Sequence, residues 1–386
     1  MIGQKGAPAT YGGVERHVEE LSAQLIRLGH NVTVYTRPHY TPRVTTTWRG
    51  IRLVSLPSIR TKHLDAITHT VLASFHAAWR GYDIIHYHGV GPSLVAWLPR
   101  VLGSRAKIVV TFHSLDRQHE KWGGFARAML RIGEWTALTF PHRTIAVSQT
   151  IRQYCRSFYG RDTMYIPNGV RSTRPTNSFR PSVLRHFDLK PNHYVLTVSR
   201  LIQHKNIHLL IKAFRKLSTQ NKLVIVGSGF HTDTYVQKLH EMAEGDPRIV
   251  FTGFQNGNDV ANLFAHARLF VTPSRSEGMP IALLEAASYG LGILASDIQP
   301  HREVLTSTKP AIGFLFRNNN LTDLQHNLQS LIRHPRQVQR SGLRAQDRMA
   351  LHFNWLTIAE QTEALYLTEL TPRRSPRLVL AQKEGA

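Results

Sequence analysis

The chain of 386 residues has one cysteine, Cys155, so it cannot form an intrachain disulfide. A single thiol fits a reducing compartment, and its usual role is that of a small core residue. The sequence has no run of about 18 or more apolar residues, which excludes a predicted membrane-spanning helix. Its first residues also lack the basic and then apolar segments of a secretory signal peptide. We therefore expect a cytoplasmic protein.

Acidic residues are scarce, because 25 Asp and Glu stand against 48 Lys and Arg, a formal net charge of +23. Residues 1–180 carry 24 cations less 9 anions, or +15, and residues 181–386 carry 24 less 16, or +8. Such a surplus attracts polyanions, among them nucleic acid, anionic lipid and doubly charged nucleotide sugars. The cations are dispersed and no nucleic-acid-binding module is recognisable, so we expect no specific nucleic-acid partner. An ordinary solvated basic surface is the alternative.

Short strand-like apolar runs alternate with helical segments in both halves of the chain. In the first half the runs are Val32–Tyr35, Ile84–His86, Ile108–Phe112, Thr144–Val147 and Met164–Ile166. In the second half they are Tyr194–Val198, Leu223–Gly227, Val250–Thr252, Leu269–Val271 and Gly292–Ser296. Two such alternating series predict an α/β fold of two doubly wound, Rossmann-like domains with parallel sheets. Ligands of such sheets bind at the carboxyl ends of the strands, so the expected site is a cleft between the domains.

We place the first domain at residues 1–175 and the second at residues 182–352, separated by a Pro-, Arg- and Ser-rich linker. A helix is predicted over residues 353–370, and residues 371–386 are typical of a disordered basic tail. Few residues precede Gln4, whereas a first strand usually has about five. The first strand is therefore expected to be short, or the natural start lies upstream of Met1.

The most informative stretch follows the run Leu269–Val271 and reads Thr-Pro-Ser-Arg-Ser-Glu-Gly-Met-Pro over residues 272–280. Pro280 suits the first position of a helix. Glu277 then lies in the loop, and Glu285 lies one to two turns into the helix. The free N–H groups of the helix start favour a phosphate, and the two carboxylates suit sugar hydroxyls. The stretch predicts a nucleotide-sugar site, although two glutamates eight apart also occur on ordinary solvated helix faces.

Three further loops follow predicted strands or open predicted helices. Gly12 and Gly13 open a helix, where the lack of side chains allows a ligand to approach the backbone. Arg200 and Lys205 lie between a strand and a helix and would converge on one anion. His113 follows the strand Ile108–Phe112. Taken singly, these features are also those of ordinary turns, surface cations and a hydrogen-bonded loop histidine.

The string Pro-Ser-x-x-Glu-Gly-x-Pro, followed by Glu-Ala-x-x-x-Gly, resembles the donor-site signature of glycosyltransferase family 4 (glycosyl transferases group 1), bacterial type. The resemblance extends from Gly12 to Tyr366. It implies the GT-B architecture, in which two Rossmann-like domains face each other across a cleft and a C-terminal helix crosses back to the first. It also implies a retaining hexosyltransferase that uses a nucleoside diphosphate sugar as co-substrate and no cofactor.

The resemblance implies a role for each candidate residue. His113 and Glu277 are expected to act on the transferred sugar, and Glu285 is expected to hold the ribose hydroxyls. The remaining residues are expected to bind the donor, chiefly its diphosphate; they are Gly12, Gly13, Arg200, Lys205, Gly229, Gly278 and Met279.

We expect no metal. His86 and His88 lie on one face of a strand, but the neighbouring sequence supplies no third ligand. Enzymes with the GT-B architecture, to which the resemblance points, also generally need no active-site metal.

The expected acceptor is a hydroxyl group, with a lipid-linked acceptor as the specific hypothesis, in cell-surface polysaccharide or glycolipid synthesis. Residues Leu94–Leu102 are mostly apolar and Arg105 follows them, while Arg117, Lys121 and Trp122 add cations beside an aromatic side chain. These segments suggest peripheral binding to an anionic membrane at its inner face. Three alternatives stay open: a nucleotide-sugar epimerase or a phosphorylase on the same architecture, and a basic nucleic-acid-binding protein.

Overall fold

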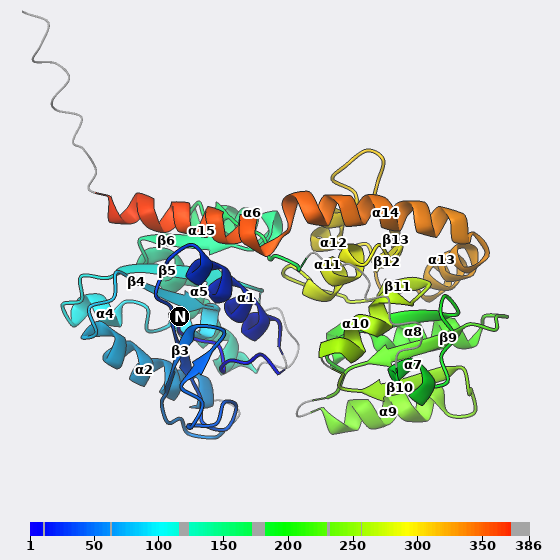
Figure 1. Ribbon diagram of the computed structural model, residues 1–386, viewed down its shortest axis with the longest axis horizontal. Coiled ribbons are helices and arrows are strands. Elements are labelled where there is room, and N and C mark those ends of the chain that lie inside the picture. Colours follow the sequence, from blue (N-terminus) through cyan, green and yellow to red (C-terminus); the bar gives the residue numbers. More distant parts are fainter. Residues whose placement is uncertain are drawn as a thin grey trace, which may run out of the picture.

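The computed structural model describes residues 1–10, 12–61, 64–115, 123–171, 182–229, 232–255 and 257–371. Two α/β domains lie side by side, the first coloured blue to cyan-green and the second green to orange (Figure 1). Residues 172–181, which include the predicted linker, residues 372–386 of the predicted tail, and Arg117, Lys121 and Trp122 lie outside the described residues.

The first domain contains two groups of strands joined by the start of the chain. One has the order β1-β3-β2 and the other the parallel order β4-β5-β6-β7. Met1 accepts a bond from Tyr35 N of β1 at 3.1 Å, and Ile2 N donates to His86 O of β4 at 2.9 Å. The expected short first strand therefore consists of one bridging residue, Ile2, between the two groups. The strands are β1 (Thr33–Thr36), β2 (Thr47–Trp48), β3 (Ile51–Ser55), β4 (Ile84–His88), β5 (Lys107–Phe112), β6 (Arg143–Ala146) and β7 (Met164–Tyr165).

Six described helices accompany these strands in the first domain. They are α1 (Gly13–Arg27), α2 (Leu64–Ala78), α3 (Val90–Ser93), α4 (Leu98–Val101), α5 (Gly124–Thr139) and α6 (Gln149–Tyr159). α1 has a strongly amphipathic pattern and buries Val18, Leu21 and Leu25. It begins at the glycine pair that the sequence places at a helix start.

The second domain has one parallel sheet with the strand order β10-β9-β8-β11-β12-β13. Counted within the domain this is the doubly wound order 3-2-1-4-5-6, with its reversal between β8 and β11. The strands are β8 (Tyr194–Val198), β9 (Lys222–Val226), β10 (Ile249–Gly253), β11 (Leu269–Thr272), β12 (Ile293–Ser296) and β13 (Phe314–Phe316). The helices are α7 (Ser182–His186), α8 (Ile207–Arg215), α9 (Asp233–Ala243), α10 (Gly257–Ala265), α11 (Ile281–Ser288), α12 (Gln299–Leu305), α13 (Leu321–Arg333) and α14 (Pro335–His352), with a 3₁₀ turn at Gln203–Lys205. The expected α/β class with two doubly wound domains is confirmed.

Alternate residues of β9 face two different cores. Val224 and Val226 belong to one buried cluster, whereas Leu223 and Ile225 belong to another on the opposite face of the sheet. A parallel strand that is covered on both faces reads as a continuous apolar run, which is why its position could be predicted from the sequence.

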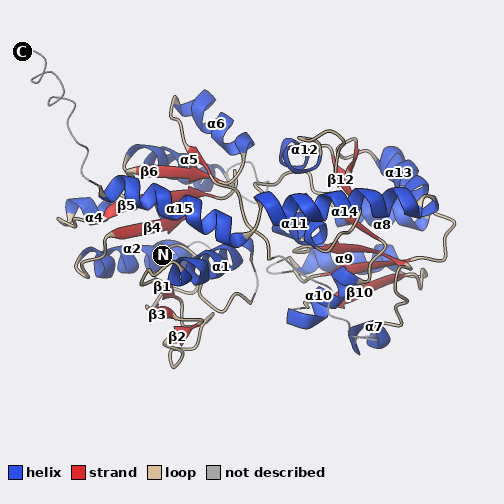
Figure 2. Cartoon of the chain, turned by 45° about the horizontal axis from the view of Figure 1, so that its top comes forward, coloured by secondary structure: helices blue, strands red, loops and turns tan. Residues whose placement is uncertain are grey.

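The last helix, α15 (Trp355–Leu370), returns to the first domain (Figures 1 and 2). Its residues Ile358 and Leu365 share a buried cluster with Leu21 and Leu25 of α1. The Tyr366 hydroxyl bonds His86 Nδ1 at 2.6 Å. The expected crossing of the C-terminal helix is therefore confirmed. Within the described residues, none of the helices has both the length and the apolar character needed to cross a bilayer.

Candidate active site

The loops that carry the predicted donor residues leave neighbouring strands of the second sheet. β8 and β11 pair in parallel, with Leu269 opposite Val195, and their carboxyl ends lie at the reversal of strand order. Arg200 and Lys205 follow β8, and Glu277 follows β11. This reversal is the place where doubly wound sheets bind their ligands, because the loops on its two sides diverge to opposite faces.

Glu277 is largely buried and forms an ion pair with Lys205 Nζ, so two predicted site residues contact each other directly. Burial raises the pKa of the Glu277 carboxyl, but the charges of Lys205 and then His301 outweigh it and lower this pKa to about 2. Ser274 also donates to the carboxylate. Glu277 is therefore a charged carboxylate held in place, rather than a proton donor at neutral pH.

Glu285, on α11, is held from the other domain. Arg16 Nη2 on α1 lies 2.9 Å from Glu285 Oε1. Burial raises the pKa of Glu285, and the Arg16 charge opposes that rise. The sequence places Pro280 at the first helical position, whereas α11 begins one residue later, at Ile281. Pro280 has an extended backbone and is the residue before the helix.

The loop before α11 packs directly on the first domain. A Cβ atom at Gly278 would lie 1.9 Å from the backbone oxygen of His113, so glycine alone allows this approach. Asn168 Nδ2 donates to the Met279 backbone oxygen at 2.9 Å. The structure thus brings three predicted site residues together across the domain boundary: His113, Gly278 and Met279.

The glycine pair of the first domain faces the same loop and helix. Gly12 has a φ of 103°, in the region that favours glycine, and a Cβ there would lie 2.0 Å from Glu15 Oε2. A Cβ at Gly13 would lie 3.6 Å from the Ile281 side chain of α11. The start of α1 therefore meets the start of α11.

Arg200 and Gly229 lie on two loops of the second domain that are joined by a backbone bond from Leu201 N to Ser228 O at 3.0 Å. A Cβ at Gly229 would lie 2.5 Å from Val236 Cγ2, so the loop is tightly packed there. Arg200 is exposed. It is close enough to Lys5 of the first domain for its charge to help lower the Lys5 pKa, an effect that follows those of burial and Arg37.

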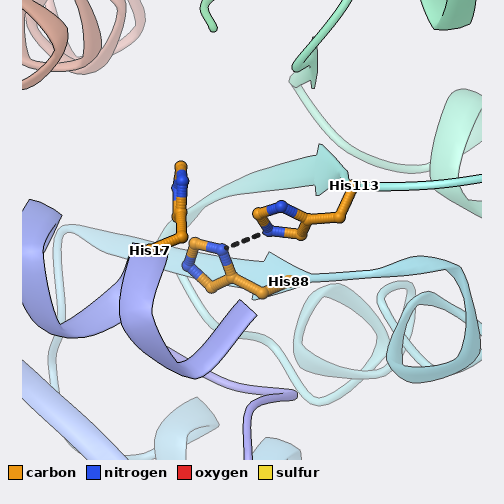
Figure 3. A group of neighbouring side chains, drawn as sticks. All are labelled: His17, His88 and His113. Atoms are coloured by element: carbon orange, nitrogen blue, oxygen red, sulfur yellow. Dashed lines mark hydrogen bonds between the residues drawn. The ribbon is translucent and has the colours of Figure 1, made fainter. Parts of the chain in front are cut away.

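Three histidine side chains lie together in the first domain, next to the loop before α11. His17 from α1, His88 from the end of β4 and His113 from the end of β5 point toward one another (Figure 3). Their nearest ring nitrogens all lie within 4.8 Å of one another. The sequence neighbouring His88 supplies no third ligand, but α1 and the end of β5 bring two further histidines to it from distant parts of the chain. His86 takes no part, since Tyr366 and Thr111 bond its two nitrogens.

Sequence reasoning did not single out Arg16, His17 or Asn168 as site residues. Asn168 closes a predicted strand and bonds His17 across 151 sequence positions. Arg16 and His17 lie in the helix that begins at Gly13, within the same short segment as the glycine pair. Their proximity to that pair was the one signal available in the sequence.

The whole arrangement suits a ligand with an anionic part and hydroxyl groups. Arg200, Lys205 and the start of α11 supply positive charge and N–H groups at the reversal of strand order. Glu277 and Glu285 supply partly buried acceptors for hydroxyl groups. The first domain contributes His113 from the opposite side.

Comparison with known proteins finds a glycosyltransferase family for each of the two domains. The protein-family model "Glycosyltransferase Family 4" matches residues 11–174, and the family model "Glycosyl transferases group 1" matches residues 186–348. A glycogen synthase of Mycobacterium tuberculosis is 24% identical over 419 residues, covering 98% of this chain and 96% of the relative.

Two further proteins extend the comparison. An Escherichia coli UDP-Gal:alpha-D-GlcNAc-diphosphoundecaprenol alpha-1,3-galactosyltransferase is 26% identical over 62% of this chain and 64% of its own. The solved structure of Anabaena Alr3699/HepE with UDP and glucose has a TM-score of 0.80 at 21% identity, covering 95% of this chain and 98% of that one. With both domains matched and the fold shared, this chain belongs to the family 4 (group 1) glycosyltransferases of GT-B architecture.

Proposed function

We propose that this glycosyltransferase transfers a hexosyl group from a nucleoside diphosphate sugar to a hydroxyl acceptor, with retention of anomeric configuration. The observation that carries the proposal is the contact of Lys205 with Glu277 at the reversal of strand order, in a loop whose Gly278 packs against His113 of the first domain. The HepE structure contains UDP and glucose, which supports a nucleotide sugar as the donor class. The proposal predicts that an α-linked donor sugar yields an α-linked product when the acceptor is present.

In this proposal the donor lies between the loops of the two domains. Glu285 accepts hydrogen bonds from the ribose hydroxyls, and Glu277 accepts them from the sugar. Arg200, Lys205 and the N–H groups before α11 bind the diphosphate, where their positive charge matters most as the leaving group forms. Gly12, Gly13 and Gly229 let backbone approach the donor closely.

The bond between the anomeric carbon and the diphosphate oxygen breaks as the acceptor oxygen attacks on the same face. The acceptor proton passes to the departing phosphate oxygen, so no protein nucleophile is required. Burial holds the pKa of His113 well below its ordinary value, which keeps the imidazole neutral beside the sugar. The proposed reaction uses no metal and no cofactor.

The first quantitative test concerns Glu285. We expect Glu285→Ala to weaken binding of the nucleoside diphosphate by about 10- to 150-fold, because hydrogen bonds to a charged group contribute about 1.5–3 kcal/mol. Isothermal titration calorimetry measures the change. Arg16→Ala is the matched control, because it removes the other half of the 2.9 Å pair and leaves the carboxylate in place. An equal loss in both variants would assign the effect to the ion pair and contradict a ribose-binding Glu285.

The proposed acceptor is lipid-linked, in cell-surface polysaccharide or glycolipid synthesis, and the enzyme binds the inner face of the membrane. The Escherichia coli relative acts, by its name, on a diphosphoundecaprenol-linked sugar. In this chain a groove of about 500 Å³ opens on the first domain between α4 and α5. It is mostly apolar, and its lining residues are Leu94, Trp97, Arg100, Val101, Ile132, Trp135, Thr136 and Phe140.

In the described segments that line this groove, the exposed charged side chains are all cationic. Val101 is 72% exposed and Trp135 49% exposed, so both apolar side chains face solvent. Arg100, Arg105 and Arg131 are exposed in the same segments. Within the described residues 90–115 and 123–140, the one acidic residue is Glu134, which is buried. Exposed tryptophans among cations suit the headgroup region of an anionic bilayer.

We therefore expect the protein to float with anionic liposomes at low salt and to dissociate at high salt, because each nearby cation contributes about 1 kcal/mol that salt screens. Trp135→Ser should weaken flotation. Phe158→Ser, which removes an exposed aromatic on α6, should not. Equal binding to neutral vesicles, or no binding at low salt, would remove the membrane proposal and leave the transferase proposal intact.

A further inference from the structure

The cluster of His17, His88 and His113 comes from three elements and is buried (Figure 3). His88 Nδ1 and His113 Nε2 are 3.2 Å apart. Two nitrogens bound to one tetrahedral zinc ion lie about 3.3 Å apart, since each Zn–N bond is about 2.0–2.1 Å long. In the described part of the chain this is the one group of three His, Cys, Asp or Glu side chains close enough to share an ion.

Hydrogen bonding fixes the tautomer of His17. Asn168 Nδ2 donates to the Met279 backbone oxygen at 2.9 Å, which leaves Asn168 Oδ1 as the atom that faces His17 Nδ1, also at 2.9 Å. His17 Nδ1 must therefore carry the proton, and Nε2 carries a lone pair. That Nε2 atom is buried and has no hydrogen-bond partner. A buried lone pair without a donor costs free energy, and a metal ion would satisfy it.

The other two rings are compatible with the same ion. His88 Nε2 faces the Met1 sulfur at 3.4 Å, a weak acceptor, so its Nδ1 is the nitrogen left to accept from His113. For His113 Nε2 to become a ligand, its proton moves to Nδ1 of the same ring. With the protons placed in this way each ring offers one lone pair, at His17 Nε2, His88 Nδ1 and His113 Nε2.

We propose that His17, His88 and His113 bind a divalent transition metal of the zinc class, and that occupancy of this site inhibits glycosyl transfer. The inhibitory part rests on the proposed function, because it follows from the place of His113 beside the transferred sugar. An ion held by His113 Nε2 fixes the ring and puts positive charge next to the reacting sugar. The transfer itself proceeds without the ion, so the site is regulatory.

Binding is tested directly with Co²⁺, which has visible bands in a tetrahedral nitrogen site and can be displaced by Zn²⁺. Protein stripped with EDTA should bind one Co²⁺ with these bands, and an equivalent of Zn²⁺ should abolish them. His17→Asn should lose the bands, while His193→Gln, at an exposed histidine of the second domain, should keep them. His88→Gln repeats the test if His17→Asn does not fold by circular dichroism. Absence of the bands in the wild type, or their survival in the folded triad variant, would overturn the site.

Inhibition is tested on the same samples. Zn²⁺ should lower the transfer rate of the wild type and of His193→Gln in proportion to occupancy. It should leave the rate of His17→Asn, relative to that variant's own metal-free rate, unchanged. Full transfer by the Zn²⁺-loaded wild type would overturn the inhibitory part. Absence of the Co²⁺ bands in a wild-type protein that transfers sugar refutes the metal site alone, whereas the bands in a wild-type protein that turns over no donor refute the proposed function alone.

Discussion

Glu277→Gln should lower kcat by at least about a hundredfold while changing the affinity for the nucleoside diphosphate by less than about threefold. Removal of one preorganised electrostatic contact at a reacting centre typically costs about 10²- to 10³-fold. Glu277 is a largely buried carboxylate beside Lys205, and its pKa of about 2 keeps it charged throughout the working range. The amide keeps the size of the side chain and loses the charge that orients both Lys205 and the sugar hydroxyls.

The matched control is Glu303→Gln. Glu303 is also a partly buried carboxylate of the second domain, but it accepts from Gln149 N at the start of α6, away from the loop before α11. We expect its kcat to stay within a fewfold of the wild type. Steady-state kinetics and calorimetry on both variants separate the two effects. A Glu277→Gln enzyme with normal kcat would show that this carboxylate does not act on the transferred sugar.

The protein should lose most of its stability between about pH 6.5 and 4. Burial lowers the pKa of His17, His69 and His301 from 6.5 to about 4. The unfolded chain takes up these protons below pH 6.5 and the folded chain does not, so the free energy of unfolding falls as pH falls. Each such histidine lowers the free energy of unfolding by about 2 kcal/mol between pH 7 and 5. Together they cost about 6 kcal/mol, a large part of the 5–15 kcal/mol of a typical domain.

Three further histidines add to this effect, because burial also lowers the pKa of His86, His88 and His113. Glu285 and Glu303 act in the opposite direction, since burial raises the pKa of both carboxyls. Urea unfolding followed by tryptophan fluorescence at pH 7.5, 6.5, 5.5 and 4.5 measures the slope. His301→Asn should reduce the number of protons taken up on unfolding by about one, which makes the free energy of unfolding less dependent on pH. His193→Gln should leave that dependence unchanged. Stability that is constant down to pH 5 would contradict neutral buried histidines.

The sequence was most informative where burial is continuous. The predicted strand Tyr194–Val198 matches the structure at both ends, and the helix predicted over residues 353–370 begins two residues later, at Trp355, and ends at Leu370. Both bury long apolar stretches, so the period of the hydrophobic residues carries the signal. β2 (Thr47–Trp48) and β13 (Phe314–Phe316) were not predicted. β2 is two residues long and exposed, and β13 is only three residues long, so neither is long enough to show a recognisable period.

The residues of the candidate site also fall into those that could be predicted from the sequence and those that could not. Residues within one loop, such as Glu277 and Gly278, could be placed because their order along the chain is also their order in the site. The bond between His17 and Asn168 and the pair of Arg16 with Glu285 join residues of distant segments. No local spacing reports such contacts, since the first depends on how the first domain folds and the second on how the two domains meet. The roles of the site residues stay predictions, which the substitutions above test.

The most direct test follows the donor itself. Purified protein in EDTA is incubated with a panel of UDP-, GDP- and dTDP-linked sugars, with and without a bacterial lipid extract, and release of nucleoside diphosphate and the anomeric proton couplings of the product are followed by NMR. We predict that one donor is consumed only when acceptor is present, that nucleoside diphosphate is released, and that an α-linked donor yields an α-linked product. Consumption without acceptor transfer, release of a sugar phosphate, or a β-linked product from that α-linked donor would contradict a retaining glycosyltransferase.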